Sequence, residues 1–383
     1  MKSVLVLHLL AAVFCWACLW TPVGGFISPP HLRSPAQYHS TDFFAGRSRS
    51  QVGSSRSSSS PAHVFMGLSD VLRIPKDVVV IGGGLAGLST ALELAKRGRQ
   101  VTVLSRNRSE AAAEAAGGMI APQTERLESG PYLDLCLASR AMYADWVASV
   151  EAIAGLGGSQ ETTHFRSVGG FIAPAFEGDA VHKWNPPPEA GQAYWMERDQ
   201  VLEMEPKLSP DIIGAWYYPQ DMNIDAQRLF KVLEKACFKA GVEVQQGVSA
   251  SGVVYDTTGT AAEGVILEDG RCLQARAIVS ATGAWMRELL PVPMIPHKGQ
   301  MMSLRVPGTH TRDSGSGGDS GADGRGSSAH CLTRVLYAEG CYIIPRSDGR
   351  IIVGSTVEPG EYSLHTTPAG MRDIMDAAMK VHP

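Results

Sequence analysis

The spacing of apolar residues changes near residue 76, and the change marks the first pair of secondary-structure elements. Val78 to Ile81 is an unbroken run of branched apolar residues, typical of a strand buried on both faces. From Leu85 to Arg97 the apolar residues recur at helical spacing, and Gly98 is placed to end the helix. A second apolar run, Gln100–Leu104, follows. The order strand, helix, strand predicts a βαβ unit.

The same two spacings predict further elements along the chain. Helices are expected at Pro131–Ala154, at Ala226–Ala240 after the N-cap Asp225, and from Pro368 onward after the N-cap Thr367. The predicted strands are Phe165–Pro174, Trp216–Tyr218, Val242–Val244, Gly252–Val254, Gly264–Ile266, Ala277–Trp285, Lys298–Arg305, Cys341–Pro345 and Arg350–Gly354. This order predicts an α/β fold in which a second lobe, built on an antiparallel sheet, is inserted into a nucleotide-binding domain with a parallel sheet.

Three glycines lie at the turn between the first strand and the first helix. Gly82, Gly84 and Gly87 have the G-x-G-x-x-G spacing. Gly82 permits the tight turn, Gly84 lets the backbone approach a pyrophosphate, and Gly87 lets the helix pack on the strand. The helix N-terminus then offers free N–H groups and a positive dipole end to the phosphates. Because all parts of the motif occur in order, we predict a dinucleotide-binding site rather than an ordinary Gly-rich turn.

One position departs from the dinucleotide-binding pattern. An acidic residue is expected at the end of the second strand, where it binds the adenosine ribose. This chain has Ser105 there, followed by Arg106. That pair also suits a pocket for a 2′-phosphate, so these residues alone leave NADP open as the dinucleotide.

Small residues dominate the next stretch, Glu110–Pro122. One interpretation is an Ala-rich helix that ends at Gly117. The other is backbone packed closely against a flat cofactor ring, which small residues allow. Composition does not decide between the two.

The N-terminal part of the chain has the composition of targeting segments. Lys2 precedes an apolar run, Val4–Leu19, and small residues lie before Phe26, which predicts a signal peptide over 1–25. Residues 26–66 are rich in Ser, Arg, Pro and His, with Asp42 as the only acid, which is typical of a disordered transit peptide. A signal followed by a transit peptide resembles the bipartite presequence of red-type plastids. A signal anchor and plain secretion are the alternatives.

Charge and cysteine usage exclude several classes of partner. The net charge is −4 and no basic helix is present, so we expect no nucleic-acid partner and a mature protein that is not embedded in a membrane. The cysteines after the signal are scattered without paired spacing, which predicts a reducing compartment with neither a disulfide framework nor a zinc site. No metal-ligand motif occurs. The Gly/Ser/Asp-rich insert 308–328 has the composition of a disordered segment.

Five motifs in the mature chain carry a family resemblance. They are Ile81–Gly87, Ala115–Pro122, Ala281–Trp285, His297–Gln300, and Cys341–Arg346 with Ile352–Thr356. Together they resemble the FAD-dependent D-amino-acid oxidase superfamily, with most likeness to the glycine oxidases of thiamin biosynthesis, from Val78 to the C-terminus. The resemblance implies a Rossmann-like FAD-binding domain with an inserted antiparallel-sheet substrate domain, as in flavoproteins of the glutathione-reductase type. It also implies FAD, rather than NADP, as the cofactor.

The resemblance assigns segments to the two domains. The FAD-binding domain would comprise 67–155 and 225–290, and the substrate domain 156–224 and 291–367. Residues 368–383 would begin the return to the FAD-binding domain.

The resemblance also assigns roles to single residues. The implied cofactor-binding residues are Gly82, Gly84, Gly87, Ser105, Arg106, Ala116, Gly117, Met119, Val248, Thr282 and Gly283. Among them, Ala116, Gly117 and Met119 would lie against the flavin, and the backbone of Val248 would meet adenine. Tyr342 would be the residue of the catalytic site that hydrogen-bonds the substrate carboxylate. An aromatic side chain that merely fills a sheet face is the alternative for Tyr342.

The implied activity is oxidation of glycine, or of another small amino acid or secondary amine, to the imine, with oxygen reduced to hydrogen peroxide. The product would serve synthesis of the thiamin thiazole, with a thiazole synthase as a partner, and the protein is expected to form a homo-oligomer. The alternatives are a sarcosine or D-amino-acid oxidase or dehydrogenase of the same family, and a non-catalytic flavin-binding remnant.

The C-terminal region departs from the family pattern. The family continues with an Arg-Pro segment that brings the carboxylate-binding Arg, and neither this segment nor the Gly-rich segment after it occurs in the printed sequence. Arg346 and Arg350 flank a predicted hairpin turn and are expected to face solvent, so neither is assigned to the carboxylate. We therefore expect the chain as printed to be catalytically inactive.

Overall fold

The computed structural model describes residues 75–156, 162–305 and 332–383, which belong to one compact unit. The predicted signal peptide, the transit-like segment and the insert 308–328 lie outside the described residues.

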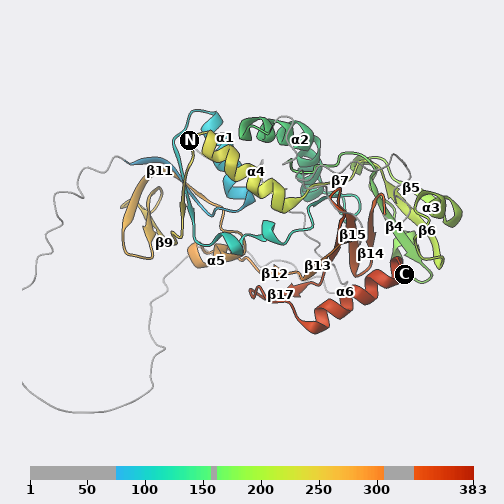
Figure 1. Cartoon of the computed structure of the whole chain (residues 1–383). Coiled ribbons are helices and arrows are strands. Elements are labelled where there is room, and N and C mark those ends of the chain that lie inside the picture. Colours follow the sequence, from blue (N-terminus) through green and yellow to red (C-terminus); the bar gives the residue numbers. More distant parts are fainter. Residues whose placement is uncertain (1–74, 157–161, 306–331) are drawn as a thin grey trace, which may run out of the picture. The chain divides into compact units, whose positions relative to one another are not determined.

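A six-stranded sheet forms the first half of the fold (Figure 1). Its strand order is β8 (Glu243–Gln246), β2 (Val101–Ser105), β1 (Lys76–Ile81), β11 (Cys272–Ser280), β10 (Ala262–Leu267) and β9 (Ala250–Tyr255). The first four strands are parallel, and the last two form an antiparallel meander. This arrangement confirms the predicted α/β fold with a parallel sheet.

Both faces of β1 are buried, as its unbroken apolar run predicts. Side chains alternate along a strand, so Val78 and Val80 point to one face and Val79 and Ile81 to the other. The first pair packs with three helices, α1 (Leu85–Lys96), α2 (Pro131–Ala154) and α4 (Ala226–Lys239). The second pair packs with residues of the meander. The strand therefore holds the turn at its C-terminal end in a fixed place.

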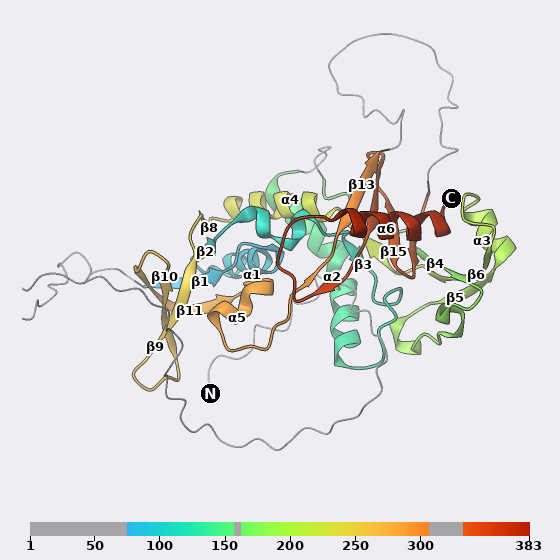
Figure 2. The same cartoon turned by 90° about the horizontal axis from the view of Figure 1, so that it is seen from below.

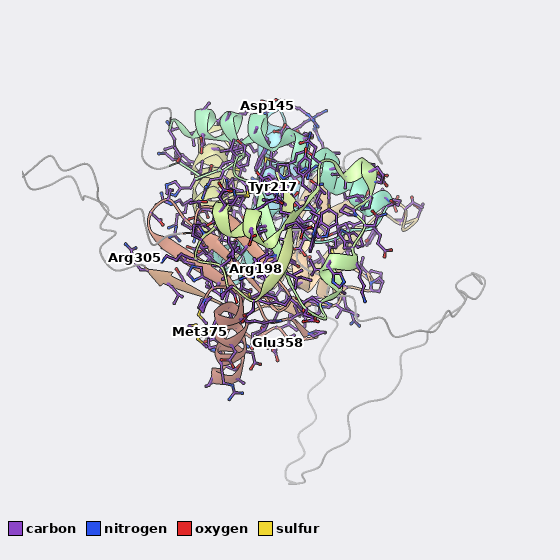
Figure 3. All side chains as sticks on the ribbon, turned by 90° about the vertical axis from the view of Figure 1, so that its right-hand side faces the viewer. Asp145, Arg198, Tyr217, Arg305, Glu358 and Met375 are labelled. Carbon is purple, nitrogen blue, oxygen red and sulfur yellow. The ribbon has the colours of Figure 1, made fainter. Side chains whose placement is uncertain are left out.

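A seven-stranded sheet forms the second half. Its order is β13 (Met301–Arg305), β16 (Arg350–Gly354), β15 (Cys341–Pro345), β14 (Val335–Ala338), β4 (Phe171–Phe176), β6 (Ile212–Tyr218) and β5 (Tyr194–Glu197). All neighbours are antiparallel except β14 and β4. Figure 3 shows this side of the molecule, with Tyr217 of β6 and Arg198 at the start of α3 (Arg198–Met204) labelled.

Helix α6 (Pro368–Val381) covers one face of the second sheet and runs along β13 and β15 (Figure 2). Its buried residues Ile374, Ala378 and Val381 lie in the core of that sheet. Residues 368–383, which we expected to begin the return to the FAD-binding domain, therefore pack with the second lobe. The opposite face of the sheet carries Phe171 and the alternate residues of β15 that include Tyr342.

Two small ladders and one short helix complete the described fold. The strand β3 (Met119–Ile120) pairs with β7 (Met222–Asn223), and β12 (His297–Lys298) pairs with β17 (Glu358–Pro359). Helix α5 (Met286–Leu289) follows β11. Among the helices in the described part of the chain, none combines the length and the apolar character that crossing a membrane requires.

Candidate functional site

The glycines after β1 have different surroundings. Gly82 has φ +112°, and a Cβ there would lie 2.2 Å from the carbonyl oxygen of Ala281. A Cβ on Gly87 would lie 1.8 Å from the carbonyl oxygen of Gly82. Gly84 has an ordinary φ of −78°, and a Cβ there would meet no described atom within 4 Å. Gly82 and Gly87 are thus required by packing within the protein, whereas Gly84 faces open space.

Gly84 is also the N-cap of α1, and none of the described side chains caps this helix end. The first N–H groups of a helix lack partners within the helix, and the dipole makes this end positive. An open cradle beside uncapped N–H groups suits the pyrophosphate of a dinucleotide. The turn therefore fits FAD.

Thr282 and Gly283 lie next to the glycine turn. The parallel strands β1 and β11 end together, and the Ala281 N–H donates to the carbonyl of Ile81 at 2.8 Å. Gly283, with φ +54°, then starts a short 3-10 turn. The carboxyl ends of parallel strands form the crevice in which such sheets bind nucleotides. The structure brings both residues to that crevice.

Ser105, Arg106 and Val248 lie together at the end of β2. Ser105 is buried, and a Cβ on Gly83 would lie 2.6 Å from its side chain. The Val248 N–H donates to the Ser105 carbonyl at 3.2 Å. The strand end therefore stands directly beside the glycine turn.

Arg106 is already occupied by protein groups. Its guanidinium donates to Glu110 at 2.8 Å and to Glu288 at 3.2 Å, and it lies 5.1 Å from the ring centre of Trp285. A 2′-phosphate would have to displace both carboxylates. This geometry disfavours the NADP interpretation.

The Ala-rich stretch is not a continuous helix. It forms two 3-10 turns, Arg108–Glu110 and Ala112–Glu114, and irregular backbone then leads into β3. Gly118 has φ +72°, and a Cβ there would lie 1.9 Å from the carbonyl oxygen of Ile224. The Ile224 N–H donates to the Gly118 carbonyl at 2.9 Å. The backbone is thus packed closely against Ile224 and is not a continuous helix, while its packing against a cofactor ring stays a prediction.

The stretch Ala116–Met119 contacts Tyr342 of the second sheet. A Cβ on Gly117 would lie 3.0 Å from the Tyr342 ring, and Met119 packs in the same apolar cluster as Tyr342. Ala116 is buried. The residues expected to line the flavin and the residue expected to bind substrate therefore lie side by side.

Tyr342 is 6% exposed, and its hydroxyl donates to Met301 Sδ at 3.8 Å, with the Ser355 side chain beside it. A Cβ on Gly354 would lie 2.5 Å from the Tyr342 ring, so this glycine makes room for the ring. Burial raises the pKa of Tyr342 to about 12, although Ser355 opposes the shift. At neutral pH Tyr342 is a neutral hydroxyl that can donate a hydrogen bond.

The expectation that Arg346 and Arg350 face solvent is wrong. Arg346 is 7% exposed and donates to the Gly117 carbonyl at 2.6 Å and to Asn223 Oδ1 at 3.1 Å. Burial lowers the pKa of Arg346 to about 10. Because strand side chains alternate, the residue four places after Tyr342 shares its face. That periodicity was the available signal for Arg346.

Arg350 is half-buried and pairs with Asp348 at 2.8 Å and with Asp225, the N-cap of α4. His164 lies near both carboxylates, and the ligand atoms of the three residues lie within 4.8 Å of one another. Both carboxylates are already paired with guanidinium groups, which satisfy their charge. The cluster therefore suits a structural ion pair better than a metal site.

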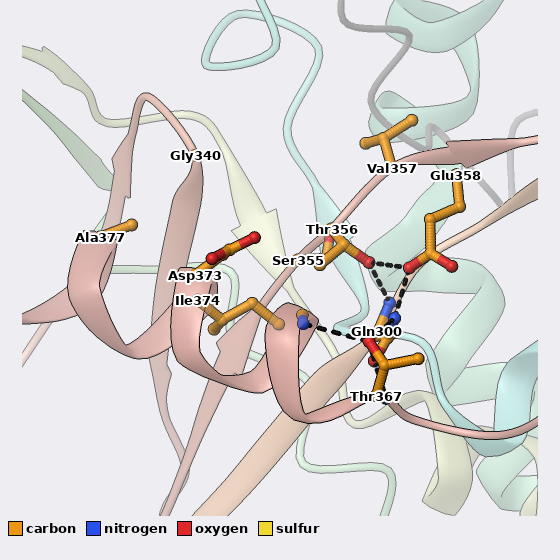
Figure 4. Close-up of a pocket in the computed structure, with 11 residues that line it drawn as sticks. Gln300, Gly340, Ser355, Thr356, Val357, Glu358, Thr367, Asp373, Ile374 and Ala377 are labelled. Atoms are coloured by element: carbon orange, nitrogen blue, oxygen red, sulfur yellow. Dashed lines mark hydrogen bonds between the residues drawn. The ribbon is translucent and has the colours of Figure 1, made fainter.

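A cavity of about 480 Å³ lies between α6 and the segment Ser355–Glu358 (Figure 4). Its floor is Gln300, which is 3% exposed. The Thr367 N–H donates to Gln300 Oε1 at 2.6 Å, and Gln300 Nε2 donates to Glu358. Ser355 lines the cavity and also lies close enough to Tyr342 to affect the pKa of its hydroxyl, so the cavity adjoins that side chain. Sequence reasoning missed it, since its walls come from separate segments.

Comparison with known proteins gives a consistent result. The family model "DAO: FAD dependent oxidoreductase" matches residues 77–383. The bifunctional protein ThiO/ThiG of Synechocystis sp. is 37% identical over 315 residues, which are 82% of this chain and 43% of that protein. The glycine oxidase of Geobacillus kaustophilus is 27% identical, over 80% of this chain and 77% of that protein. The chain thus spans less than half the length of the bifunctional relatives.

Solved structures share the fold. The crystal structure of glycine oxidase from Geobacillus kaustophilus superposes with a TM-score of 0.68 and 25% identity, over 81% of this chain and 79% of that one. The L-alpha-glycerophosphate oxidase of Mycoplasma pneumoniae, solved with FAD bound, gives a TM-score of 0.62 at 14% identity, over 81% and 79%. The second likeness concerns the fold alone.

Proposed function

The chain belongs to the family of FAD-dependent oxidoreductases, and from this premise we propose that it oxidises glycine, or another small amino acid or secondary amine, to the imine. Water then converts the imine to the 2-oxo acid and ammonia, and oxygen takes up the two electrons and two protons as hydrogen peroxide. The similarity to glycine oxidases supports glycine as the first substrate to test.

One observation carries this proposal. The hydroxyl of Tyr342 lies on the sheet face that also carries Ile344, Ile352 and Phe171, directly beside Gly117. An apolar wall excludes water from a reacting amine, and a neutral hydroxyl within it can orient a carboxylate. A substrate with few atoms depends strongly on such a contact, which suits a small amino acid.

The chain's own residues have two tasks toward the cofactor. The open cradle at Gly84 and the N-terminus of α1 would hold the pyrophosphate, and Ala116, Gly117 and Met119 would form the wall along the ring system. FAD supplies the two-electron oxidation when it is bound. Tyr342 would donate to the substrate carboxylate and so orient the amine.

The sarcosine oxidase alternative would gain from covalent attachment of flavin through a cysteine. Cys341 does not suit this role, because it lies in the core between β15 and α6, on the face of β15 opposite Tyr342. Burial also raises the pKa of the Cys341 thiol to about 12, which disfavours the reactive thiolate. We therefore propose noncovalent FAD.

We further propose that the imine is used in thiamin thiazole synthesis and that a thiazole synthase is the partner. The support is that the ThiO/ThiG relatives join two functions in one protein, of which this chain matches 43%. Co-purification of a thiazole synthase with the tagged protein from its own cells tests this partner.

The activity is tested on the protein isolated from its own cells and supplied with FAD. Glycine, sarcosine and D-alanine are compared by release of peroxide. We expect glycine to give the highest kcat/KM. A preference for sarcosine or D-alanine would assign the alternative substrate, and flavin binding without turnover of any of the three would favour the non-catalytic remnant.

A further inference from the structure

Gly117 is held between Tyr342 of β15 and Arg346, the residue that directly follows β15. Tyr342 packs against its Cα, and Arg346 Nη2 donates to its carbonyl oxygen at 2.6 Å. Tyr342 leaves the face of β15 that also carries Ile344. The strand and the residue after it thus fix both the position of Gly117 and the direction in which its carbonyl points.

The burial of Arg346 is costly, and its hydrogen bonds do not offset the cost fully. The guanidinium donates to two neutral oxygens, those of Gly117 and Asn223, while its Nε has no hydrogen-bond partner among the described residues. Asp225 acts on it through its charge, but the Asp225 carboxylate accepts its own hydrogen bonds from Arg350 and from the Arg228 N–H. A buried charge with incomplete pairing destabilises a fold. An arginine at this position is therefore a poor choice if its role is only to stabilise the structure.

The peptide that Arg346 contacts is the one expected to face the flavin. The Gly117 carbonyl and the Gly118 N–H belong to a single planar unit, so a bond to the oxygen fixes the direction of the N–H as well. A cationic donor on the oxygen also polarises the peptide and strengthens that N–H as a donor. The charge and the fork of Arg346 therefore both act on this peptide.

We propose that Arg346 is a positioning residue for FAD, which orients the Gly117–Gly118 peptide against the flavin and favours the electron-rich reduced form. The inference rests on the FAD site proposed above. Lysine would keep the charge, but it could not reach the Gly117 carbonyl and Asn223 together with the geometry of a planar fork.

The test compares Arg346→Lys and Arg346→Met with the wild-type protein, without any substrate. FAD affinity is measured by quenching of flavin fluorescence, and the flavin midpoint potential by dye equilibration. We expect the FAD Kd to rise about 10- to 100-fold in both variants, as for the loss of one charge-assisted hydrogen bond. We expect the midpoint potential to become more negative in Arg346→Met only, because Arg346→Lys retains the charge.

Arg140→Lys is the matched control. Arg140 is also largely buried and also donates to a backbone carbonyl, that of Ala190, at 2.9 Å, but it does not contact the Ala116–Met119 stretch. We expect it to lower thermal stability without changing FAD affinity. If Arg346→Met fails to fold, Arg346→Lys decides: a wild-type Kd in that variant overturns the proposal. Wild-type protein that binds no FAD would overturn the proposed function as well.

Discussion

The glycines of the turn after β1 are not equivalent, because Gly82 and Gly87 would clash with backbone if they carried a Cβ, and Gly84 would not. We expect Gly84→Val to lose bound FAD and to melt at a temperature close to that of FAD-free wild type. The valine side chain would occupy the space that the pyrophosphate needs. The measurements are thermal unfolding and the ratio of flavin to protein after gel filtration.

Gly87→Val is the control for this prediction. Its Cβ would lie 1.8 Å from the Gly82 carbonyl oxygen, so the helix cannot pack on the turn and the protein should not fold. Stoichiometric flavin in a folded Gly84→Val protein would contradict the assignment of the cradle to pyrophosphate.

Tyr342 offers a second prediction at this scale. Tyr342→Phe removes one hydrogen bond to a charged carboxylate, which contributes about 1.5–3 kcal/mol, so KM should rise about 10- to 100-fold with a smaller change in kcat. Because the pKa of Tyr342 is raised to about 12, it stays protonated from about pH 7 to about pH 10, and its contribution to KM should be constant there. Tyr217→Phe, in the core on the other face of the second sheet, should leave KM unchanged. Equal KM values in both variants would remove Tyr342 from the substrate site.

The sequence predicted the roles of some residues of the candidate site but not of others. The spacing of Gly82, Gly84 and Gly87 identified the turn, because each need for glycine is set locally. Arg346 was missed because it was considered as part of a turn, whereas its contacts depend on the face that β15 presents to the other sheet. Its even offset from Tyr342 shows the shared face, but the sequence does not show what lies opposite.

At the scale of elements, helix ends were predicted well because capping is local. Asp225 accepts from the Arg228 N–H at 3.1 Å and Thr367 from the Gly370 N–H at 3.1 Å, and both helices begin at the expected residue. The strand expected from Phe165 instead begins at Phe171, since Gly169 and Gly170 have φ of +99° and +63°, which breaks an extended strand. The predicted strand Lys298–Arg305 is likewise two short strands that pair with different partners.

The ion pairs that join the start of α4 to the turn after β15 predict acid sensitivity. Burial alone would raise the pKa of Asp348, but Arg350 lowers it to about 2 overall. A carboxyl whose pKa is lower in the folded state stabilises the fold above its unfolded pKa of about 4. That contribution is lost as the pH falls from about 4 toward about 2.

We therefore expect Arg350→Met to lower stability at neutral pH by about 1–3 kcal/mol, because Asp225 and Asp348 lose their nearer guanidinium partner and keep only the longer contacts with Arg228. The difference from wild type should shrink as the pH falls through the same window. Denaturant unfolding between about pH 7 and about pH 3 measures it. Arg271→Met, at an exposed pair with Asp269, should change little. A difference that stays constant with pH would show that the ion pairs are not its source.

At the scale of the molecule, the order of strands along the chain predicts two sheets. It does not predict which strands pair within each sheet. β4 and β14 are parallel neighbours, with Val335 opposite Phe171, although more than half of the second lobe's sequence separates them. Chain order alone favours pairing of consecutive strands. The position of α6 on the second sheet depends on the same long-range packing. The start of this helix could therefore be predicted from the sequence, but the lobe on which it packs could not.

The cellular location of the whole protein is predicted from its residues 1–66. A fluorescent protein fused to these residues should reach the plastid of a red-lineage alga, because their composition predicts a signal peptide followed by a transit segment. Phe26→Ala in the fusion should redirect it. Appearance of the unaltered fusion in the medium would favour secretion.

The last prediction concerns turnover by residues 67–383 alone. A carboxylate is best fixed by a guanidinium, which binds it through two parallel hydrogen bonds. Arg346 lies four residues after Tyr342, but both of its terminal nitrogens are bonded to Gly117 and Asn223. Without this guanidinium, glycine loses about one to two decades in its orienting equilibrium, and a misplaced Cα lowers the rate further. We expect no glycine-dependent peroxide above buffer from this fragment.

A chimera tests whether an added guanidinium supplies this contact. The segment that follows the aligned region in the Geobacillus kaustophilus glycine oxidase is joined after Pro383, since the superposition covers 79% of that chain. The chimera should release peroxide from glycine, and a version whose added arginines are replaced by methionine should not. Rapid turnover by residues 67–383 alone would instead mean that Arg346 exchanges Asn223 for the substrate carboxylate, and Asn223→Ala would then lower KM rather than raise it.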